Sequence, residues 1–328
     1  MINQLKVVCG HQTNPYHNLA LELYLLETVR EGECILYLWQ NQRSVIIGRN
    51  QLADNECDRR ALEADGGFLV RRCSGGGAVY HDLGNLNFTF LMASEDFDEA
   101  RQSEVIMRAL NHLGLDCRKS GRNDLTIDGR KFSGHAYYHH QGHSYHHGTI
   151  MLEVNRDDLE RYLRVSQLKL QDKHVRSVRS RVINLREIQP KLTVDDLKTA
   201  LIDGFAEVYQ LPIKMITDAQ IAEEVLAGYR ERLSSPGWIN GKTKAYQHSR
   251  EARFDWGLIR IDYDRQDEMI MDCAVYTDSL QADYLEKVSD LLKGKKISEL
   301  NELLNDPAHE KINRDIITLL KGSEDDEL

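Results

Sequence analysis

The sequence predicts an α/β (α+β) chain with one large domain followed by a smaller one. At 328 residues the chain is long enough for both. Its first half contains short runs of β-branched and aromatic residues, typical of strands, and longer stretches with helical spacing. A polar, glycine-containing stretch from residue 235 to about 248 resembles a linker. We therefore expect a large domain over residues 1–246 and an accessory domain over residues 247–328.

In the N-terminal half, Asn18 is expected to cap a leucine-rich helix that ends near Gly32. A second helix is expected over residues 103–113. Strand-like runs are expected at residues 35–39, 44–47, 67–70 and 86–91. A glycine-rich loop separates the last two runs. This order of strand, loop and strand differs from the strand, loop and helix of Walker and Rossmann motifs, so those nucleotide-binding folds are disfavoured.

In the C-terminal half, a helix is expected from Thr193 to Tyr209, with Thr193 as its cap and aspartates in its first turn. A hairpin is expected from residues 257–264 and 269–277, followed by two or three helices. The acidic end, residues 323–328, is expected to be disordered.

Charge and cysteine usage narrow the class of protein. The net charge is −10, which argues against a nucleic acid or an anionic membrane as partner, because such binding needs a surplus of Lys and Arg. The six cysteines contain no C-x-x-C pair, as expected for reduced thiols in a cytoplasm. The N-terminus lacks the apolar core of a signal peptide, and no apolar run is long enough to span a bilayer. We therefore expect a cytoplasmic protein.

The first candidate site is the loop after residue 70. Gly75, Gly76 and Gly77 would let backbone N–H groups approach an anion, while Arg72 and Ser74 add polar donors. The alternative is a tight hairpin with a salt-bridged arginine. Three consecutive glycines are costly in an ordered domain, which favours the anion site.

The second candidate site surrounds Lys131, which follows an expected Asp128-Gly129 turn. A lysine here could bridge a substrate carboxylate and the α-phosphate of ATP, and stabilise the charge that develops as an acyl adenylate forms. Asn123 and Asp124 could coordinate Mg²⁺ or phosphates, or could simply form a turn.

Six of the thirteen histidines lie between residues 135 and 147. Their spacing matches no common zinc signature, and Gln141, Gly142 and Ser144 indicate a surface loop, so we expect no zinc. His147, which enters an apolar strand, is the histidine for which a functional role is expected. The basic stretch 177–182 could cover an adenylate, although its residues alone favour an edge strand.

Taken together, these blocks resemble those of lipoate–protein ligases. The resemblance covers nearly the whole chain, and so many ordered blocks are far more specific than any single glycine motif. The blocks are Asn14-Pro15-Tyr16, Ile47-Gly48-Arg49, the loop 71–82, Gly84-Asn85, residues 121–124, residues 129–134, residues 146–149 and residues 177–185.

The resemblance implies the fold shared by biotin and lipoate ligases, with a mixed sheet and a small α/β C-terminal domain. It also implies a two-step reaction. Lipoate and ATP with Mg²⁺ would give lipoyl-AMP and pyrophosphate, and a lysine of an acceptor protein would then take the lipoyl group. The implied acceptors are the E2 subunits of 2-oxoacid dehydrogenases and the glycine-cleavage H protein or an H-like protein.

The resemblance also assigns residues. Lys131 would be catalytic, and Asp124 would bind Mg²⁺. Lipoate would contact Glu22, Arg72, Ser74, Gly75, Gly76, Gly77, Ala78, Val79, His81, His147 and Gly148. ATP and the adenylate would contact Asn85, Asn123, Asp124, Lys131, Ser133, Ala136, Thr149, Arg179 and Ser180.

This chain departs from the family pattern at His135, where a small residue is usual, and at Leu23, where a second glutamate is common. Two alternatives remain open. A cysteine-dependent octanoyl or lipoyl transferase would use the Cys73 thiolate and no ATP. A non-catalytic lipoate- or acceptor-binding protein would not need the charge of Lys131. The residues do not decide between lipoate and octanoate.

Overall fold

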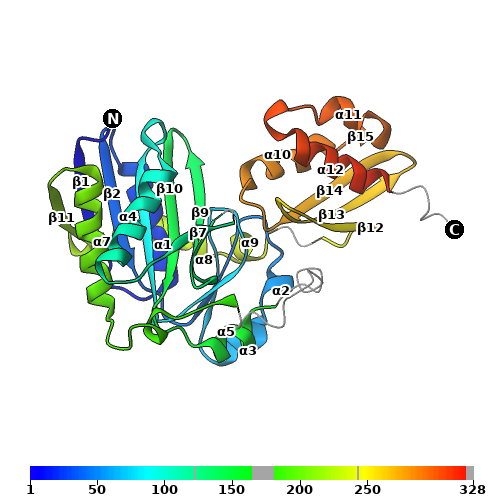
Figure 1. Ribbon diagram of the computed structural model, residues 1–328. Coiled ribbons are helices and arrows are strands. Elements are labelled where there is room, and N and C mark those ends of the chain that lie inside the picture. Colours follow the sequence, from blue (N-terminus) through cyan, green and yellow to red (C-terminus); the bar gives the residue numbers. More distant parts are fainter. Residues whose placement is uncertain (122, 165–180, 242–243, 323–328) are drawn as a thin grey trace.

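The computed structural model describes residues 1–121, 123–164, 181–241 and 244–322. It contains an eight-stranded mixed sheet, a three-stranded sheet and, near the C-terminus, a four-stranded sheet (Figure 1). The predicted α/β class is therefore confirmed. Within these residues no helix is both long and apolar enough to cross a membrane.

The large sheet has the strand order β11-β1-β2-β6-β10-β9-β8-β7. Its strands are β1 (Gln4–Cys9), β2 (Glu33–Trp39), β6 (Asn85–Ala93), β7 (Arg118–Ser120), β8 (Asp124–Ile127), β9 (Arg130–His140), β10 (His143–Met151) and β11 (Ile213–Thr217). Every residue of β2 is buried, because helices cover both faces of the sheet.

Alternation along the strands divides the apolar side chains of this sheet between two cores. Leu36 and Leu38 of β2 face α4 (Glu99–His112) and α7 (Val194–Tyr209), whereas Tyr37 and Trp39 face α1 (Pro15–Thr28) and α8 (Glu223–Ser234). The helix expected from Thr193 to Tyr209 is confirmed, and Thr193 accepts a hydrogen bond from Asp196 N as its cap.

The small sheet has the order β4-β3-β5 and carries the glycine loop between β4 and β5. Its strands are β3 (Ser44–Ile47), β4 (Phe68–Arg71) and β5 (Val79–His81). The short helices α2 (Ala53–Glu56), α3 (Arg59–Ala64) and α5 (Arg156–Tyr162) contribute to a core beside it. The expected strand over residues 86–91 is present as β6, but β5 was not expected and lies between it and the glycine loop.

The C-terminal sheet has the order β12-β13-β14-β15 and a core of its own (Figure 1). Its strands are β12 (His248–Phe254), β13 (Gly257–Gln266), β14 (Met269–Thr277) and β15 (Lys295–Lys296). The helices are α10 (Ala282–Leu292), α11 (Leu300–Leu303) and α12 (Glu310–Lys321). The predicted hairpin and the helices after it are confirmed.

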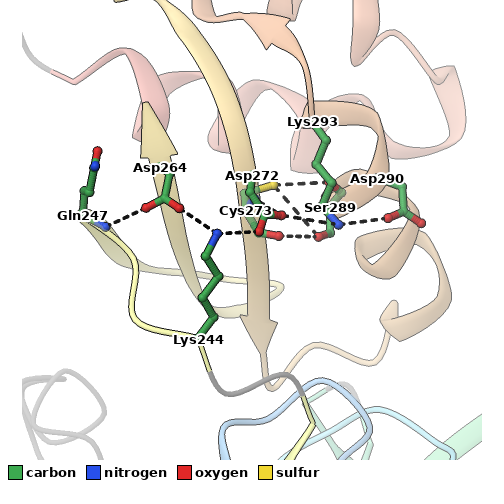
Figure 2. A network of polar contacts seen from close by, with 8 residues as sticks. All are labelled: Lys244, Gln247, Asp264, Asp272, Cys273, Ser289, Asp290 and Lys293. Carbon is green, nitrogen blue, oxygen red and sulfur yellow. Dashed lines mark hydrogen bonds and ion pairs between the residues drawn. The ribbon is translucent and has the colours of Figure 1, made fainter. Parts of the chain in front are cut away.

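The stretch expected to be a linker is partly ordered by packing. Helix α9 (Pro236–Asn240) lies within it and buries Ile239. Lys244 is held by carboxylates on two strands of the C-terminal sheet, with Nζ 2.8 Å from both Asp264 Oδ2 and Asp272 Oδ2 (Figure 2). Gln247 N also donates to Asp264 Oδ1 (3.0 Å). The last residues before β12 are therefore fixed to the C-terminal sheet.

Two expectations were wrong in detail. The cap of α1 is Asn14, not Asn18, and the helix ends at Thr28. Asn18 is instead a fully buried residue within the helix, and its amide bonds to neighbouring chain segments. The expected surface loop with histidines is the hairpin of β9 and β10, in which only Gln141 and Gly142 form the turn. The first error arose because Asn is a favoured N-cap residue, and the second because polar residues were taken as a sign of exposure.

Phe205 of α7 is fully buried, and its ring lies 5.7 Å from that of Phe90, measured between centroids. Phe205→Ala should leave a cavity and lower the free energy of unfolding by about 3–5 kcal/mol. Urea denaturation followed by circular dichroism would measure this loss. The exposed neighbour Asp203 provides a control, because Asp203→Ala should change stability by less than about 0.5 kcal/mol. A similar effect of both substitutions would contradict the assigned packing.

Candidate functional site

A cavity lies between the large sheet and the small sheet, on the α1 side of the large sheet. Twelve residues named from the sequence line it: Arg72, Gly76, Gly77, Ala78, Val79, His81, Asn123, Lys131, Ala136, His147, Gly148 and Thr149. His135, which the sequence analysis named as a departure from the family pattern, also lines it, and the sequence reasoning missed five others: Leu19, Trp39, Ile46, Asn87 and Gly134. The structure thus brings both candidate sites, the glycine loop and the Lys131 hairpin, to one cavity.

The cavity runs across the strands of the large sheet. Trp39 of β2 lies opposite Asn87 of β6, Asn87 lies opposite Thr149 of β10, and Thr149 Oγ1 accepts from Gly134 N of β9 (3.3 Å). Neighbouring strands are about 4.8 Å apart, so this row extends about 14 Å from β9 to β2. It forms a floor between Lys131 at one end and Trp39 at the other.

The glycine loop and β5 form the opposite wall. A Cβ atom built on Gly76 would lie 3.9 Å from Ala136 Cβ of β9, and the ring of His81 lies 6.3 Å from that of Trp39 on β2. The wall therefore crosses the sheet in the same direction as the floor, from the Lys131 end to the Trp39 end.

Arg72 organises the glycine loop from within. Its guanidinium donates to the carbonyl groups of Gly75 (2.6 Å), Gly77 (2.9 Å) and Ile46 (3.0 Å), and to Ser74 Oγ (3.0 Å). Burial lowers the pKa of Arg72 to about 10, so the group is still charged at neutral pH. In this structure the N–H groups of Arg72 donate to carbonyl groups and to Ser74. Direct contact of Arg72 with a substrate stays a prediction.

His147 connects the glycine loop to α1. Its Nδ1 donates to Glu22 Oε1 (2.9 Å), because a carboxylate can only accept, and its Nε2 then accepts from Ser74 Oγ (2.8 Å). Thr89 Oγ1 also donates to Glu22 Oε1 (2.8 Å). Glu22 and Ser74 are buried and do not line the cavity. They fix the orientation of His147, which does.

Lys131 lies at the edge of the cavity, about one third exposed, with Nζ 2.7 Å from Asp124 Oδ1. A Cβ atom on Gly134 would lie 2.7 Å from this Nζ, so glycine there leaves room for the lysine. The expected turn is present, since Asp128 and Gly129 both have positive φ angles, 51° and 73°. Lys131 thus follows the Asp128-Gly129 turn by two residues, after Arg130.

Of the two asparagines expected at the adenylate, Asn123 lines this end of the cavity and Asn85 does not. Asn123 Nδ2 donates to the carbonyl of His135 (2.5 Å), and His135 N donates to the carbonyl of Asn123 (2.8 Å). Asn85 is buried at the start of β6, and its Nδ2 donates to Asn87 Oδ1 (2.9 Å). Asn85 does not line the cavity, and neither do Gly75 and Asp124.

The buried histidines of the hairpin form a chain on the α4 side of the sheet. His146 bonds to Gln102 of α4 (2.9 Å) and to His135 (3.0 Å), whose Nε2 is 3.1 Å from Ser133 Oγ. Burial lowers the pKa of His135 to about 3, with a further contribution from Lys131, so the ring is neutral. Ser133, expected at the adenylate, is fully buried in this chain and does not line the cavity. Arg179 and Ser180 lie outside the described residues.

The C-terminal domain contacts the outer side of the glycine loop. Gly76 N donates to Ser279 O (3.0 Å), and a Cβ atom on Gly75 would lie 2.5 Å from the same oxygen. Arg49, just after β3, forms ion pairs with Asp283 (2.9 Å) and Glu286 (2.6 Å) of α10. The glycines therefore permit close domain contact as well as a narrow cavity.

Comparison with known families gives two consecutive matches. Residues 14–206 match the model of the lipoyl protein ligase A/B catalytic domain, and residues 243–320 match that of the bacterial lipoate protein ligase C-terminus. The chain is 37% identical to lipoate-protein ligase A of Psychrobacter cryohalolentis over 301 residues, and 36% identical to that of Blochmanniella pennsylvanica over 298. These alignments cover 89% and 88% of both chains.

Solved structures agree with these matches. The crystal structure of P. falciparum LipL1 in complex with lipoate has a TM-score of 0.83 at 27% identity and covers 95% of this chain and 99% of its own. A lipoate-protein ligase A bound with ATP has a TM-score of 0.63 at 29% identity, covering 74% and 99%. A bipartite ligase studied with its E2 lipoyl domain, from Thermoplasma acidophilum, has a TM-score of 0.64 at 31% identity, covering 76% and 100%.

Cys73, the candidate nucleophile of the transferase alternative, is 3% exposed and packs in the core beneath α1. Burial raises the pKa of its thiol to about 12, so the reactive thiolate is suppressed at neutral pH. In the folded protein Cys73 should therefore resist iodoacetamide at about pH 7.5, and in urea it should react readily. Peptide mass spectrometry would measure both rates. Rapid labelling of the folded protein would instead support the thiolate alternative.

Proposed function

Because the chain belongs to the lipoyl protein ligase A/B family and is a lipoate–protein ligase, we propose that it joins lipoate to ATP and then to a protein lysine. In the first step a lipoate carboxylate oxygen attacks the α-phosphorus, the bond to the β-phosphate oxygen breaks, and pyrophosphate leaves. In the second step the acceptor amine attacks the acyl carbonyl, an amide forms, and AMP leaves with the carboxylate-derived oxygen. The amine loses one proton to the surrounding solvent.

The observation that carries this proposal is the position of Lys131 at one end of an apolar cavity that ends at Trp39. A carboxylate at Lys131 would leave the aliphatic chain of lipoate to fill the space over Asn87 and Thr149. The ammonium group would neutralise charge on the carboxylate and the α-phosphate as they approach, and this stabilisation grows as the adenylate forms. Asn123, Ala136 and Thr149 lie close enough to this end to contact the adenylate.

The remaining assigned residues support the acyl chain. Arg72 and Ser74 hold the shape of the loop from Gly75 to Val79, and Glu22 orients His147. Gly148 leaves space that a side chain would take from Phe88, because a Cβ atom there would lie 2.5 Å from Phe88 Cζ. Asn85 acts through Asn87. Arg179 and Ser180 stay proposals from the family resemblance alone.

Mg²⁺ fits the donors at the Lys131 end. It is usually held by one or two carboxylates together with phosphate oxygens. Asp124 offers one half-buried carboxylate beside Lys131 and would hold the ion together with the ATP phosphates. The bound ion would neutralise phosphate charge during pyrophosphate departure.

For the acceptor we propose a lipoyl domain of an E2 subunit, in keeping with the Thermoplasma acidophilum ligase that is paired with such a domain. A glycine-cleavage H protein or H-like protein is the second candidate. We also propose a cytoplasmic location, since all six cysteines are free thiols. We place the boundary between the domains close to residue 246, and the contacts of Lys244 support a boundary no later than this (Figure 2).

The purified protein, mixed with lipoate, ATP and Mg²⁺, should release pyrophosphate and then lipoylate an added apo-lipoyl domain. A coupled pyrophosphate assay and intact mass spectrometry of the acceptor would follow the two steps. Acyl transfer from a carrier protein without pyrophosphate release would exclude the proposed mechanism.

Lys131→Ala should reduce the rate of adenylation by about a hundredfold or more, because one preorganised charge at the reacting phosphate is lost. The side chain is partly exposed, so the free energy of unfolding should change little. Lys119→Ala on β7, two strands from β9 in the same sheet, is a matched control with an exposed lysine and should keep normal turnover. Near-normal adenylation by Lys131→Ala would remove this residue from the mechanism.

A further inference from the structure

His81 closes the Trp39 end of the cavity. It lies on β5, is 3% exposed, and meets Trp39 edge to face. Its Nδ1 is 3.1 Å from Asn41 Nδ2. Burial lowers the pKa of His81 to about 3, with a contribution from nearby Arg72, so the ring is neutral and carries one proton. The position of that proton decides what the cavity presents to a ligand at this end.

A chain of amides determines the proton position. Asn18 Nδ2 faces the main-chain carbonyls of Gln12 (3.1 Å) and Gln40 (2.8 Å), which can only accept, so the orientation of this amide is fixed. The same nitrogen is 2.9 Å from Asn41 Oδ1, so its two hydrogens are shared among three acceptors, and the Nδ2 group of Asn41 cannot point towards it because two donors would then meet. Asn41 therefore directs its Nδ2 towards His81 and donates to Nδ1. Since Nδ1 accepts, the single proton of the neutral ring is on Nε2.

His81 lines the cavity, and its Nε2–H group is buried without a partner among the described residues. Asn87, which is 1% exposed, has the same property: its Oδ1 accepts from Asn85 Nδ2, while its own Nδ2 bonds to no group in the described part of the chain. Two residues that line one cavity thus each have a buried donor without a partner in the described part of the chain. Unpaired buried donors are unfavourable, which points to a ligand atom that accepts from them.

The distance from Lys131 indicates which ligand atom this is. Asn87 lies on β6, two strands from the β9 strand that carries Lys131, and so about 10 Å away across the sheet. His81 lies further along, beside Trp39 of β2. A carboxylate at Lys131 would leave the distal end of the acyl chain at these donors. In lipoate that end is a dithiolane ring, and its sulfur atoms are weak acceptors. In octanoate it is a hydrocarbon, which would leave both donors unpaired.

We propose that His81 Nε2–H and Asn87 Nδ2–H form a two-donor subsite for the ring sulfur atoms of lipoate, and that this subsite favours lipoate over octanoate. The proposal rests on the proposed function, because it uses the orientation with the carboxylate at Lys131. Asn18 and Asn41 are positioning residues that keep His81 in the donating tautomer. Sequence reading placed His81 at the substrate but gave it no chemistry, and it missed Asn87.

The test compares lipoate with 5-cyclopentylpentanoate, in which two methylene groups replace the sulfur atoms. Calorimetric titration of the full-length protein without ATP should show about tenfold tighter binding of lipoate. His81→Leu should abolish most of this preference, mainly by weakening lipoate binding, and Asn87→Leu should reduce it. His81→Gln, which can place a donor near the same position, should retain part of it. Tyr80→Phe, at the next residue along β5, is the matched control and should leave the preference unchanged.

Equal binding of the two acids by the wild-type protein, or an unchanged ratio in His81→Leu, would overturn the subsite. Failure of the subsite can be distinguished from failure of the proposed ligase function. Pyrophosphate release with lipoate and an unchanged ratio would refute the subsite alone, whereas a shifted ratio without pyrophosphate release would refute the ligase chemistry alone.

The tautomer of His81 can be measured independently of ligand binding. Nuclear magnetic resonance of ¹⁵N-histidine-labelled protein should show His81 protonated at Nε2 and unprotonated at Nδ1, with no titration between about pH 5 and pH 8, because its pKa is far lower. Asn41→Leu should remove this bias towards Nε2 and lower the preference for lipoate, although Asn41 does not line the cavity. A proton on Nδ1 in the wild-type protein would contradict the amide chain.

Discussion

One buried guanidinium shapes the cavity. Arg72 gathers the carbonyl groups of Gly75 and Gly77, together with Ile46 of the small sheet, so the loop folds back on itself instead of extending into solvent. Without Arg72 these carbonyls would be buried and unpaired, which is unfavourable. The same group holds Ser74, which in turn donates to His147. The wall and one part of the floor are thus connected through a single charged side chain.

The loop shape also connects the cavity to the C-terminal domain. The Gly76 N–H group is one that the sequence suggested for binding an anion, and in this structure it donates to Ser279 O. An anion bound at that N–H would have to replace the contact with the C-terminal domain. Anion binding at the loop and docking of the C-terminal domain therefore compete for the same Gly76 N–H group. The docked arrangement also requires glycine at residue 75, because a Cβ atom there would lie too close to Ser279 O. The glycines of this loop thus allow contact with the C-terminal domain in addition to any role in ligand binding.

Local patterns were sufficient for much of this molecule, but not for the cavity. The helix from Val194 to Tyr209 and the turn at Asp128-Gly129 each depend on neighbouring residues, and both were predictable. Strand β12 was missed because its sequence, HSREARF, is mostly charged and polar and its register depends on β13. Trp39 and Asn87 were missed because they are far apart in the sequence. They become neighbours only because β2 pairs with β6. The order of strands in the sheet is not encoded in any local pattern.

The buried histidines differ in whether both of their ring nitrogens have hydrogen-bond partners within the protein. His146 and His135 bond through both ring nitrogens, one to Gln102, one to Ser133 and each to the other, so their chain is complete within the protein. His147 is likewise paired through both nitrogens. A complete chain can be buried at little cost, because each donor finds an acceptor. His81 differs from these three: its Nδ1 is paired, but its Nε2 is buried without a bond among the described residues. A buried imidazole with one nitrogen paired and the other unpaired is prepared for a ligand, and this asymmetry, not the number of histidines, distinguishes His81 from the other three.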